Sequence, residues 1–403
     1  MAKINTNPEV RFAGFEQDWE ERELSKILKE RKVMQKITED APILAFAAGQ
    51  GVIDRSERKS NNRDHLTHDQ ENKIYKLTEL NDIVYNPSNL KYGAIDRNKH
   101  GRGVISPIYV TFTTEEEPSF VELIVKSEKF KLRALQYEEG TVVKRQSVKP
   151  ENLLSLKVNI SSSKDEQKKI GELFDSLETL IKLHQVKRNK LLNVRRSIIQ
   201  KLFPKLGSNL PAVRFNNFSD SWKELEIGLL ADRHDNLRVP VKADKRVAGQ
   251  TPYYGANGIQ GYVKGHTHEG EFILVAEDGA NNLKNYPVQY VNGKIWVNNH
   301  AHVLQAKKGI ANNIYLKYAI SSTNIEPFLV GGGRAKLNSE PMMKIKVWIP
   351  EDIKEQEKIG TYLYSIDQLL SLHVEGLEKI INIKKACFEK LTSATSKHFA
   401  QIK

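Results

Sequence analysis

The feature that most constrains this sequence is an internal repeat, because each half of the chain opens and closes with the same residues. Residues 8–19 recur as 211–222, and both copies contain Pro-x-Val-Arg-Phe followed by a second Phe and a Trp. Residues 166–184 recur as 355–373, and both copies begin Glu-Gln-x-Lys-Ile-Gly and end in His. Two long copies indicate a tandem duplication rather than a solenoid, which needs three or more short repeats.

The middles of the two copies, residues 30–150 and 232–335, show no such match. The duplication is therefore a shared frame that holds two different parts. We expect an α+β fold in which two mixed α/β domains are separated by a pair of long antiparallel coiled-coil helices, with pseudo-two-fold symmetry. The expected boundaries are 1–160 for the first domain, 161–207 for the first helix, 208–350 for the second domain and 351–400 for the second helix.

Apolar residues recur at alternating spacings of three and four near the end of each copy, which is the heptad pattern of a coiled coil. About 40 residues of helix would be ~60 Å long. Such a stripe cannot be buried by one helix alone, so we expect the two helices to pair antiparallel about an approximate two-fold axis. The alternative is that each helix packs on its own domain. The predicted seam comprises Ile170, Leu177, His184 and Leu191 in the first copy, and Ile359, Ile366, His373 and Ile380 in the second.

His184 and His373 occupy equivalent positions near the middle of the two predicted helices. In an antiparallel pair they would lie close together at the axis, where a polar pair can fix the register. A metal site or a pH-dependent switch is one alternative, and two solvated or otherwise satisfied histidines are the other.

The charge of the chain favours a polyanionic ligand. Lys and Arg total 62 against 50 Asp and Glu, for a formal net charge of +12, and each phosphate neutralised by a cation releases a counterion. The single cysteine, Cys387, excludes an internal disulfide framework. The sequence has neither an apolar signal core near Met1 nor a run of about 20 apolar residues, so we expect a cytoplasmic protein without membrane contact.

Polar loops in the two middles carry side chains of the kinds that contact base edges and phosphates. Residues 253–263 are typical of two short strands around an Asn-Gly turn. For each single residue the alternative is an ordinary solvated loop position. The candidate DNA contacts are Arg55, Arg63, Arg97, Lys99, Arg102, Arg145 and Gln146 in the first copy, and Asn257, Asn281, Asn282, Lys284, Arg334 and Lys336 in the second.

Motifs of catalysis are absent from the sequence. There is no Walker motif, no His-Glu-x-x-His and no Asn/Asp-Pro-Pro-aromatic turn of a DNA amino-methyltransferase. Two His-x-His pairs, at 266–268 and 300–302, would each share one face of a strand. No further ligand set accompanies them, so we expect no metal site and no cofactor on this chain.

Taken in their duplicated order, these segments resemble the specificity subunits of type I restriction-modification enzymes, over nearly the whole chain. The first copy departs from the pattern at Ile160-Ser161, where the second copy has Ile-Pro. The matching segments are the Pro-x-Arg-Phe…Trp openings at 8–19 and 211–222, residues 253–263 and 277–281, the Ile-Pro entry to the helix at 349–356, and Arg-Ala-Lys-Leu-Asn at 334–338.

The resemblance implies that each domain is a target-recognition domain that reads one half of a bipartite, asymmetric site on double-stranded DNA. It also implies that the helices set the unread gap and dock two modification subunits. S-adenosylmethionine would belong to those subunits, and ATP with Mg²⁺ to two restriction subunits, so this chain would be non-catalytic. The alternatives are a non-catalytic coiled-coil DNA-binding regulator and a stand-alone methyltransferase or nuclease.

Overall fold

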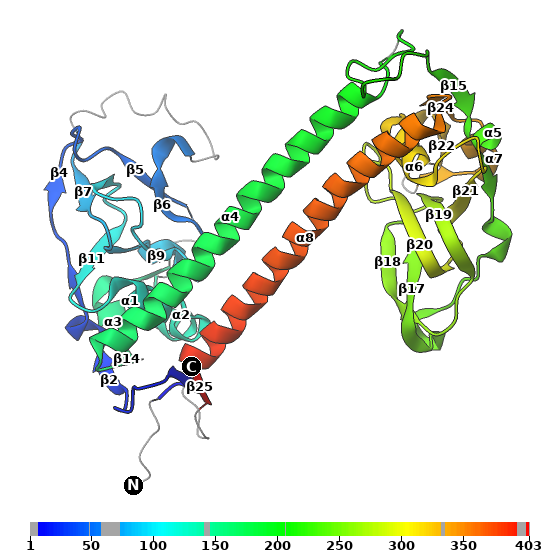
Figure 1. The fold of residues 1–403 in the computed structure, drawn as a ribbon. Helices are drawn as coiled ribbons and strands as arrows, with labels where there is room; N and C mark the ends of the chain where they lie inside the picture. Colours follow the sequence, from blue (N-terminus) through cyan, green and yellow to red (C-terminus); the bar gives the residue numbers. More distant parts are fainter. Residues whose placement is uncertain are drawn as a thin grey trace. The chain divides into compact units, whose positions relative to one another are not determined.

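The computed structural model divides the chain into two compact units, which we call unit 1 (Met1–Leu183 and Leu377–Lys403) and unit 2 (His184–Gly376). The division cuts both long helices, α4 (Lys164–Leu202) and α8 (Ile353–Thr392), so each unit contains part of each helix (Figure 1). The structure describes residues 7–47, 49–57, 73–140, 146–205, 207–331, 335–392 and 400–402.

Both long helices begin at capping side chains. The N–H of Glu166 donates to Oγ of Ser163, and the N–H of Lys354 donates to Oδ1 of Asp352. Such caps satisfy backbone donors that lack a partner within the helix. Pro204 follows the end of α4, where a proline cannot continue a helix.

Unit 1 is built from short strands and three short helices around one main core. Its largest sheet has four antiparallel strands in the order β3-β11-β8-β9. The helices are α1 (Pro118–Lys126), α2 (Glu128–Leu135) and α3 (Pro150–Leu154). The strands are β1 (Val10–Phe12), β2 (Glu20–Glu23), β3 (Leu28–Glu30), β4 (Met34–Gln35), β5 (Leu44–Ala47), β6 (Gly51–Asp54), β7 (Tyr75–Thr78), β8 (Ile83–Tyr85), β9 (Ile95–Arg97), β10 (Gly103–Ile105), β11 (Val110–Thr114), β12 (Glu138–Glu139), β13 (Ser147–Val148), β14 (Lys157–Ile160) and β25 (Ala400–Ile402).

Unit 2 is organised around a six-stranded sheet in the order β16-β21-β19-β20-β17-β18. Helix α6 buries Tyr315 and Tyr318 in the same core as Ile273 and Val275 of the sheet. The helices are α5 (Ile227–Leu230), α6 (Asn313–Ser322) and α7 (Ser339–Met343). The strands are β15 (Lys223–Glu226), β16 (Ala231–Arg233), β17 (Ala248–Gly255), β18 (Gly258–Val263), β19 (His268–Ala276), β20 (Val288–Val297), β21 (Ala301–Ala306), β22 (Leu329–Val330), β23 (Lys336–Leu337) and β24 (Lys346–Ile349).

The repeated sequence segments form the same interactions in both units. Arg11 makes a two-pronged ion pair with Glu166, with both nitrogen–oxygen distances 2.8 Å. Arg214 makes the same pair with Glu355, at 2.6 and 2.7 Å. Both carboxylates are buried, so loss of either arginine would leave an unpaired buried charge. The Arg of the opening motif and the Glu of the Glu-Gln motif thus bind each other, a link that the sequence did not reveal.

Each Glu-Gln motif also ties its helix to the domain helix of the same copy. Gln167 and Gln356 each donate to the carbonyl oxygen of the residue six positions earlier, at 2.8 and 2.9 Å. Each also accepts the N–H of a capping residue, Glu117 before α1 and Asn312 before α6. In both units the exit strand pairs antiparallel with the strand after the Trp, as β14 with β2 and as β24 with β15.

The glycines of the repeated motif allow close approach between helices. A Cβ on Gly171 would lie 1.9 Å from Oγ of Ser119 in α1. A Cβ on Gly360 would lie 2.8 Å from the backbone N of Tyr315 in α6. A glycine inside a helix costs about 1 kcal/mol of stability relative to alanine. Here the absence of a Cβ allows α1 or α6 to pack directly on the long helix.

Within unit 2 the described parts of α4 and α8 run antiparallel. His184 and His373 are in contact, with their Nδ1 atoms 3.3 Å apart and ring centroids at 5.3 Å. Further along the two helices, Arg195 pairs with Asp367. The antiparallel register thus brings the two equivalent histidines together.

Unit 1 contains the counterpart of this arrangement. Lys384 pairs with Glu178 at 2.8 Å, and these residues are the sequence equivalents of Arg195 and Asp367. The rings of Phe174 and Phe388 meet edge to face, with centroids at 6.0 Å. The same kind of interhelical ion pair is therefore present in both units.

The predicted seam is used in two ways. Ile170 and Ile359 belong to the cores of units 1 and 2, so the start of each helix packs on its own domain. The histidine pair and the ion pairs lie farther along, where the helices contact each other. Each helix therefore packs on its own domain over one part of its length and pairs with the other helix over another part. Leu177 and Ile366 are buried, whereas Leu191 and Ile380 are half-buried.

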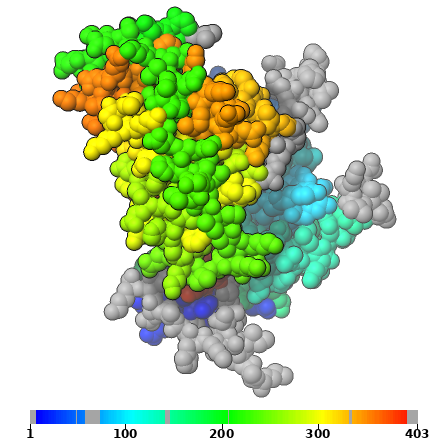
Figure 2. Space-filling model, turned by 90° about the vertical axis from the view of Figure 1, so that its right-hand side faces the viewer, coloured from blue at the N-terminus to red at the C-terminus, as the bar shows by residue number. Residues whose placement is uncertain are grey.

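The structure confirms the expected fold class, with two mixed domains and two long helices. The units defined by contacts differ from the predicted segments, since the end of each helix packs on a domain. In unit 2, green and orange residues that are far apart in the sequence lie against each other on the face shown in Figure 2. In the described part of the chain no helix is long and apolar enough to cross a membrane.

Candidate nucleic-acid interface

Hydrogen bonds join the turn between β17 and β18 to the loop between β19 and β20 in unit 2. The side chain of Asn257 donates through Nδ2 to the carbonyl oxygen of Gly279, at 2.8 Å. Its Oδ1 accepts the N–H of Asn281, at 2.9 Å. Asn282 folds the same loop, because its Oδ1 accepts the N–H groups of Lys284 and Asn285. Four of the predicted contacts, Asn257, Asn281, Asn282 and Lys284, are thus brought into one exposed group.

The segment around Lys336 joins this group. Leu337 donates its N–H to the carbonyl oxygen of Glu277, at 2.7 Å, and the backbones of Lys336 and Asp278 form an isolated antiparallel β-bridge. The Lys336 ammonium lies 3.1 Å from a carboxylate oxygen of Glu277 and remains exposed. Three loops separated in sequence therefore meet, and we call them the unit 2 loop cluster (residues 256–257, 277–287 and 335–337).

A polar network in the interior of unit 2 contacts the residues of the loop cluster. His302 is almost fully buried and contacts Oδ2 of Asp235 through Nδ1 and the carbonyl oxygen of Leu337 through Nε2. Arg238 donates to Glu277 at 2.6 Å and to the carbonyl oxygen of Ala301 at 2.9 Å. Because these partners belong to several loops, the network holds the exposed residues in fixed positions.

The electrostatics of this network favour ionised carboxylates. Burial opposes ionisation of Asp235, but its hydrogen bond and charge interaction with His302 and a hydrogen bond from the N–H of Val303 keep its pKa below the usual value. Burial likewise opposes ionisation of Glu277, and hydrogen bonds from Arg238 and Lys336 lower its pKa overall. The negative charge of Glu277 partly offsets the cation of Lys336, which is therefore already paired within unit 2.

Sequence reasoning missed Arg238 and His300. Arg238 follows β16, and nothing in the sequence pairs it with Glu277, 39 positions away. His300 contacts Asp278 through Nδ1 and is half-buried beside the loop cluster. It was considered only as a member of a His-x-His pair.

One histidine of each His-x-His pair, His268 or His302, is buried in unit 2. Burial lowers the pKa of His268, whose ring contacts Thr267 and the carbonyl oxygen of His234. His302 is occupied by Asp235 and Leu337. No group of three or more potential metal ligands occurs among the residues that the structure describes.

The predicted contacts of unit 1 are not gathered in the same way. Arg97 binds Glu122 and Asp175 and is only 10% exposed, so its guanidinium is committed to joining β9, α1 and α4. Lys99 contacts the carboxylates of Glu122 and Glu178. These two residues therefore hold the domain to the long helix.

Other predicted contacts in unit 1 remain on its surface. Arg102 is exposed and pairs with Asp40 and Glu79. Gln146 donates to the carbonyl oxygen of Gly140 at 3.4 Å. Arg55 lies half-buried in the turn after β6, without an ion pair to any described residue. Arg63, Arg145 and Arg334 lie outside the described residues.

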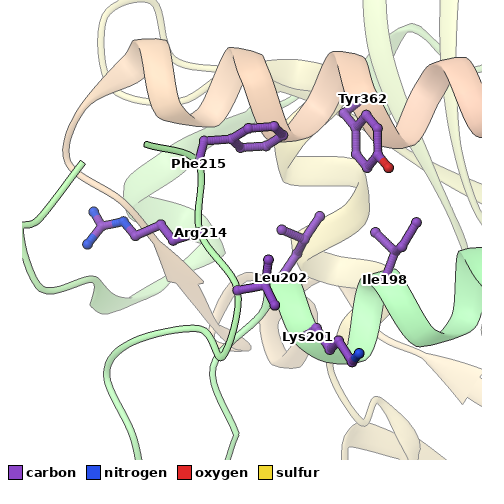
Figure 3. Close-up of a pocket in the computed structure, with 7 residues that line it drawn as sticks. Ile198, Lys201, Leu202, Arg214, Phe215 and Tyr362 are labelled. Carbon is purple, nitrogen blue, oxygen red and sulfur yellow. The ribbon is translucent and has the colours of Figure 1, made fainter. Parts of the chain in front are cut away.

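An apolar cavity of about 190 Å³ lies in unit 2 between the end of α4 and α8. Ile198, Leu202, Phe215 and Tyr362 line it, whereas the charged end of Arg214 points away from it (Figure 3). It lacks the convergent polar groups of a small-molecule site. Its lining residues belong to the repeated frame rather than to the loop cluster.

The sequence and the fold are similar to those of known proteins. A family model described as the type I restriction modification DNA specificity domain matches residues 219–382. A putative type I restriction enzyme specificity subunit from Haemophilus influenzae is 48% identical over 150 residues. Residues 219–382 therefore resemble this DNA specificity domain. The match covers 37% of this chain and 38% of that relative, so it spans well under half of the relative's length.

Two further specificity subunits extend the comparison. The EcoprrI specificity subunit of Escherichia coli is 26% identical over 142 residues, covering 35% of this chain and 33% of that subunit. The crystal structure of the S subunit from M. genitalium superposes with a TM-score of 0.70 at 16% identity, over 97% of this chain and all of that one. The fold of the specificity subunit therefore extends over almost the entire chain.

Proposed function

We propose that this chain is the non-catalytic, DNA-reading subunit of a type I restriction-modification enzyme in the cytoplasm. Each domain would read one half of a bipartite site on double-stranded DNA. The observation that carries the proposal is the unit 2 loop cluster. It presents the exposed side chains of Asn281 and Asn282 beside the cation of Lys284, and Asn257 joins the two loops that hold them. Amides suit adenine edges, and lysine suits phosphates or guanine.

A second set of side chains supports docking of two modification subunits on the helices. Several large apolar residues remain exposed at sequence-equivalent positions of α4 and α8. Paired exposure of this kind fits two copies of one partner, since isolated apolar residues are common but matched sets are not. The matched positions are Leu180 with Leu369, Leu183 with Leu372, and Val194 with Ile383.

Under this proposal catalysis belongs to the partners. The modification subunits would supply S-adenosylmethionine and methylate adenine, and two restriction subunits would use ATP and Mg²⁺. The purified chain is expected to show no methyl transfer from S-adenosylmethionine and no magnesium-dependent cleavage of DNA. Either activity would support the stand-alone enzyme instead.

Two measurements test the proposal. Methylome sequencing of a host carrying the system should reveal a bipartite adenine-methylated motif that disappears when this chain is deleted. Size-exclusion chromatography with the modification subunit should give two partner copies per chain. A stable homodimer without partners would favour the coiled-coil DNA-binding regulator.

A further inference from the structure

The C-terminal half of α4 differs in charge from the equivalent half of α8. Residues 184–202 hold six Lys and Arg and no Asp or Glu. The equivalent residues, 373–391, hold four Lys and three Glu. We call residues 184–202 the cationic segment. The duplication thus conserves the helix but not its charge, which differs by five between the two segments.

Most cations of this segment are free for an external partner. Arg195 pairs with Asp367. The other five are exposed and form no ion pair with any residue that the structure describes. They are Lys187, Arg188, Lys190, Arg196 and Lys201.

Apolar side chains in the same segment identify the kind of partner. Val186, Leu192 and Val194 are exposed to 43%, 38% and 49%. A phosphate backbone gains nothing by covering them, whereas a protein surface removes their apolar area from water. Exposed apolar residues flanked by cations fit an apolar stripe flanked by carboxylates.

We infer that the cationic segment is the stronger of two unequal docking sites for the modification subunit, whose facing surface is acidic. The inference rests on the proposed docking function. Two identical acidic surfaces meet net charges of +6 on residues 184–202 and +1 on residues 373–391. At low salt the first partner copy therefore binds at α4 and the second at α8. Salt screens the difference, because the charges lie in water at the rim of the contact.

The test places the glutamates of α8 into α4. Asn189 and Gln200 are exposed and are the sequence equivalents of Glu378 and Glu389. The modification subunit of the same system is titrated onto the full chain at about 50 and 500 mM salt, with stepwise binding followed by native mass spectrometry. For the wild type we expect two dissociation constants about tenfold apart at low salt, which converge at high salt.

The N189E/Q200E variant should bring the two constants to within about threefold at low salt. The uncharged N189Q/Q200N variant should keep the wild-type separation, and circular dichroism checks that both variants fold. Wild-type constants that are equal, or equally separated at both salts, would overturn the inference and leave docking intact. Loss of DNA affinity in N189E/Q200E with unchanged partner binding would also overturn it, in favour of a polyanion site. Failure of the wild type to bind any partner would reject the docking function itself.

Discussion

At the scale of the residue, Asn257 has the most direct role in shaping the candidate interface. Its side chain uses both the amide donor and the oxygen acceptor to hold one loop against another. An arginine or lysine at a DNA surface acts mainly through charge, whereas this asparagine fixes where its neighbours lie. Removing the Asn257 side chain should therefore weaken binding to the specific DNA site more than binding to nonspecific DNA.

The N257A variant should bind its specific half-site about tenfold more weakly while nonspecific DNA binding changes less than twofold. The lost hydrogen bonds release the loop at 277–287, but they remove no cation. Competition binding in the assembled enzyme, with specific and random duplexes at one salt concentration, measures both affinities. N285A, in the same loop, serves as a control for a side chain that does not join the loops. An equal loss of affinity for the specific and the random duplex would mean that Asn257 only stabilises the fold.

The Asp235 carboxylate makes unit 2 sensitive to acid. Its folded pKa lies below the unfolded value, so it contributes stability above about pH 4 that is lost as pH falls through the folded pKa. The D235N variant should cost about 2 kcal/mol at neutral pH, because it weakens the contact with buried His302. Its free energy of unfolding should then fall less than that of the wild type between about pH 5 and 3.

Urea unfolding followed by tryptophan fluorescence measures this pH dependence. D232N changes an exposed aspartate on the same strand, β16, and should follow the wild type. Parallel curves for D235N and the wild type would show that the Asp235 network is not what acid disrupts.

At the scale of the element, the sequence predicted what is periodic or repeated. The long helices follow from apolar spacing, the hairpin of β17 and β18 from its Asn-Gly turn, and the contact of the two histidines from the repeat and the antiparallel pairing of the helices. The role of Gly171 could not be predicted, because its reason is Ser119, 52 positions away in the chain and brought near only by packing. The ion pairs of Arg97 could not be predicted for the same reason, because Glu122 and Asp175 lie on other elements and come near it only in the folded domain.

Alanine at either motif glycine should destabilise its unit by about 1–3 kcal/mol, despite the better helix propensity of alanine. In G171A the obstacle is the Ser119 side chain, so S119G should restore much of the loss. In G360A the obstacle is the backbone of Tyr315, and no side-chain change should rescue it. Chemical unfolding compares the variants with Q185A on the exposed face of α4. Equal rescue in both units would contradict this distinction.

At the scale of the whole molecule, the long helices are proposed to act as the spacer between two DNA readers. Removing about one turn from each helix, residues 187–190 and the equivalent 376–379, shortens both helices by the same length. The enzyme should then methylate the same two half-sites with a gap shorter by one or two base pairs, since a turn is ~5.4 Å and a base pair ~3.4 Å. Methylome sequencing measures the motif, with a deletion in α4 alone as the mismatched control. Altered bases with an unchanged gap would refute the spacer role.

The division of both helices between the units has a consequence for synthesis on the ribosome. Leu391, at the end of α8, is fully buried in the main core of unit 1 with Trp19 near the start of the chain. Unit 2 spans an uninterrupted stretch, His184–Gly376, and is complete before that leucine is translated. Unit 1 is therefore synthesised first but completed last. Its apolar core remains incomplete until residues more than 300 positions after Trp19 have been translated. Contacts between residues so far apart form slowly, and the incomplete core is prone to aggregation. We therefore expect the nascent chain to bind chaperones during most of its elongation.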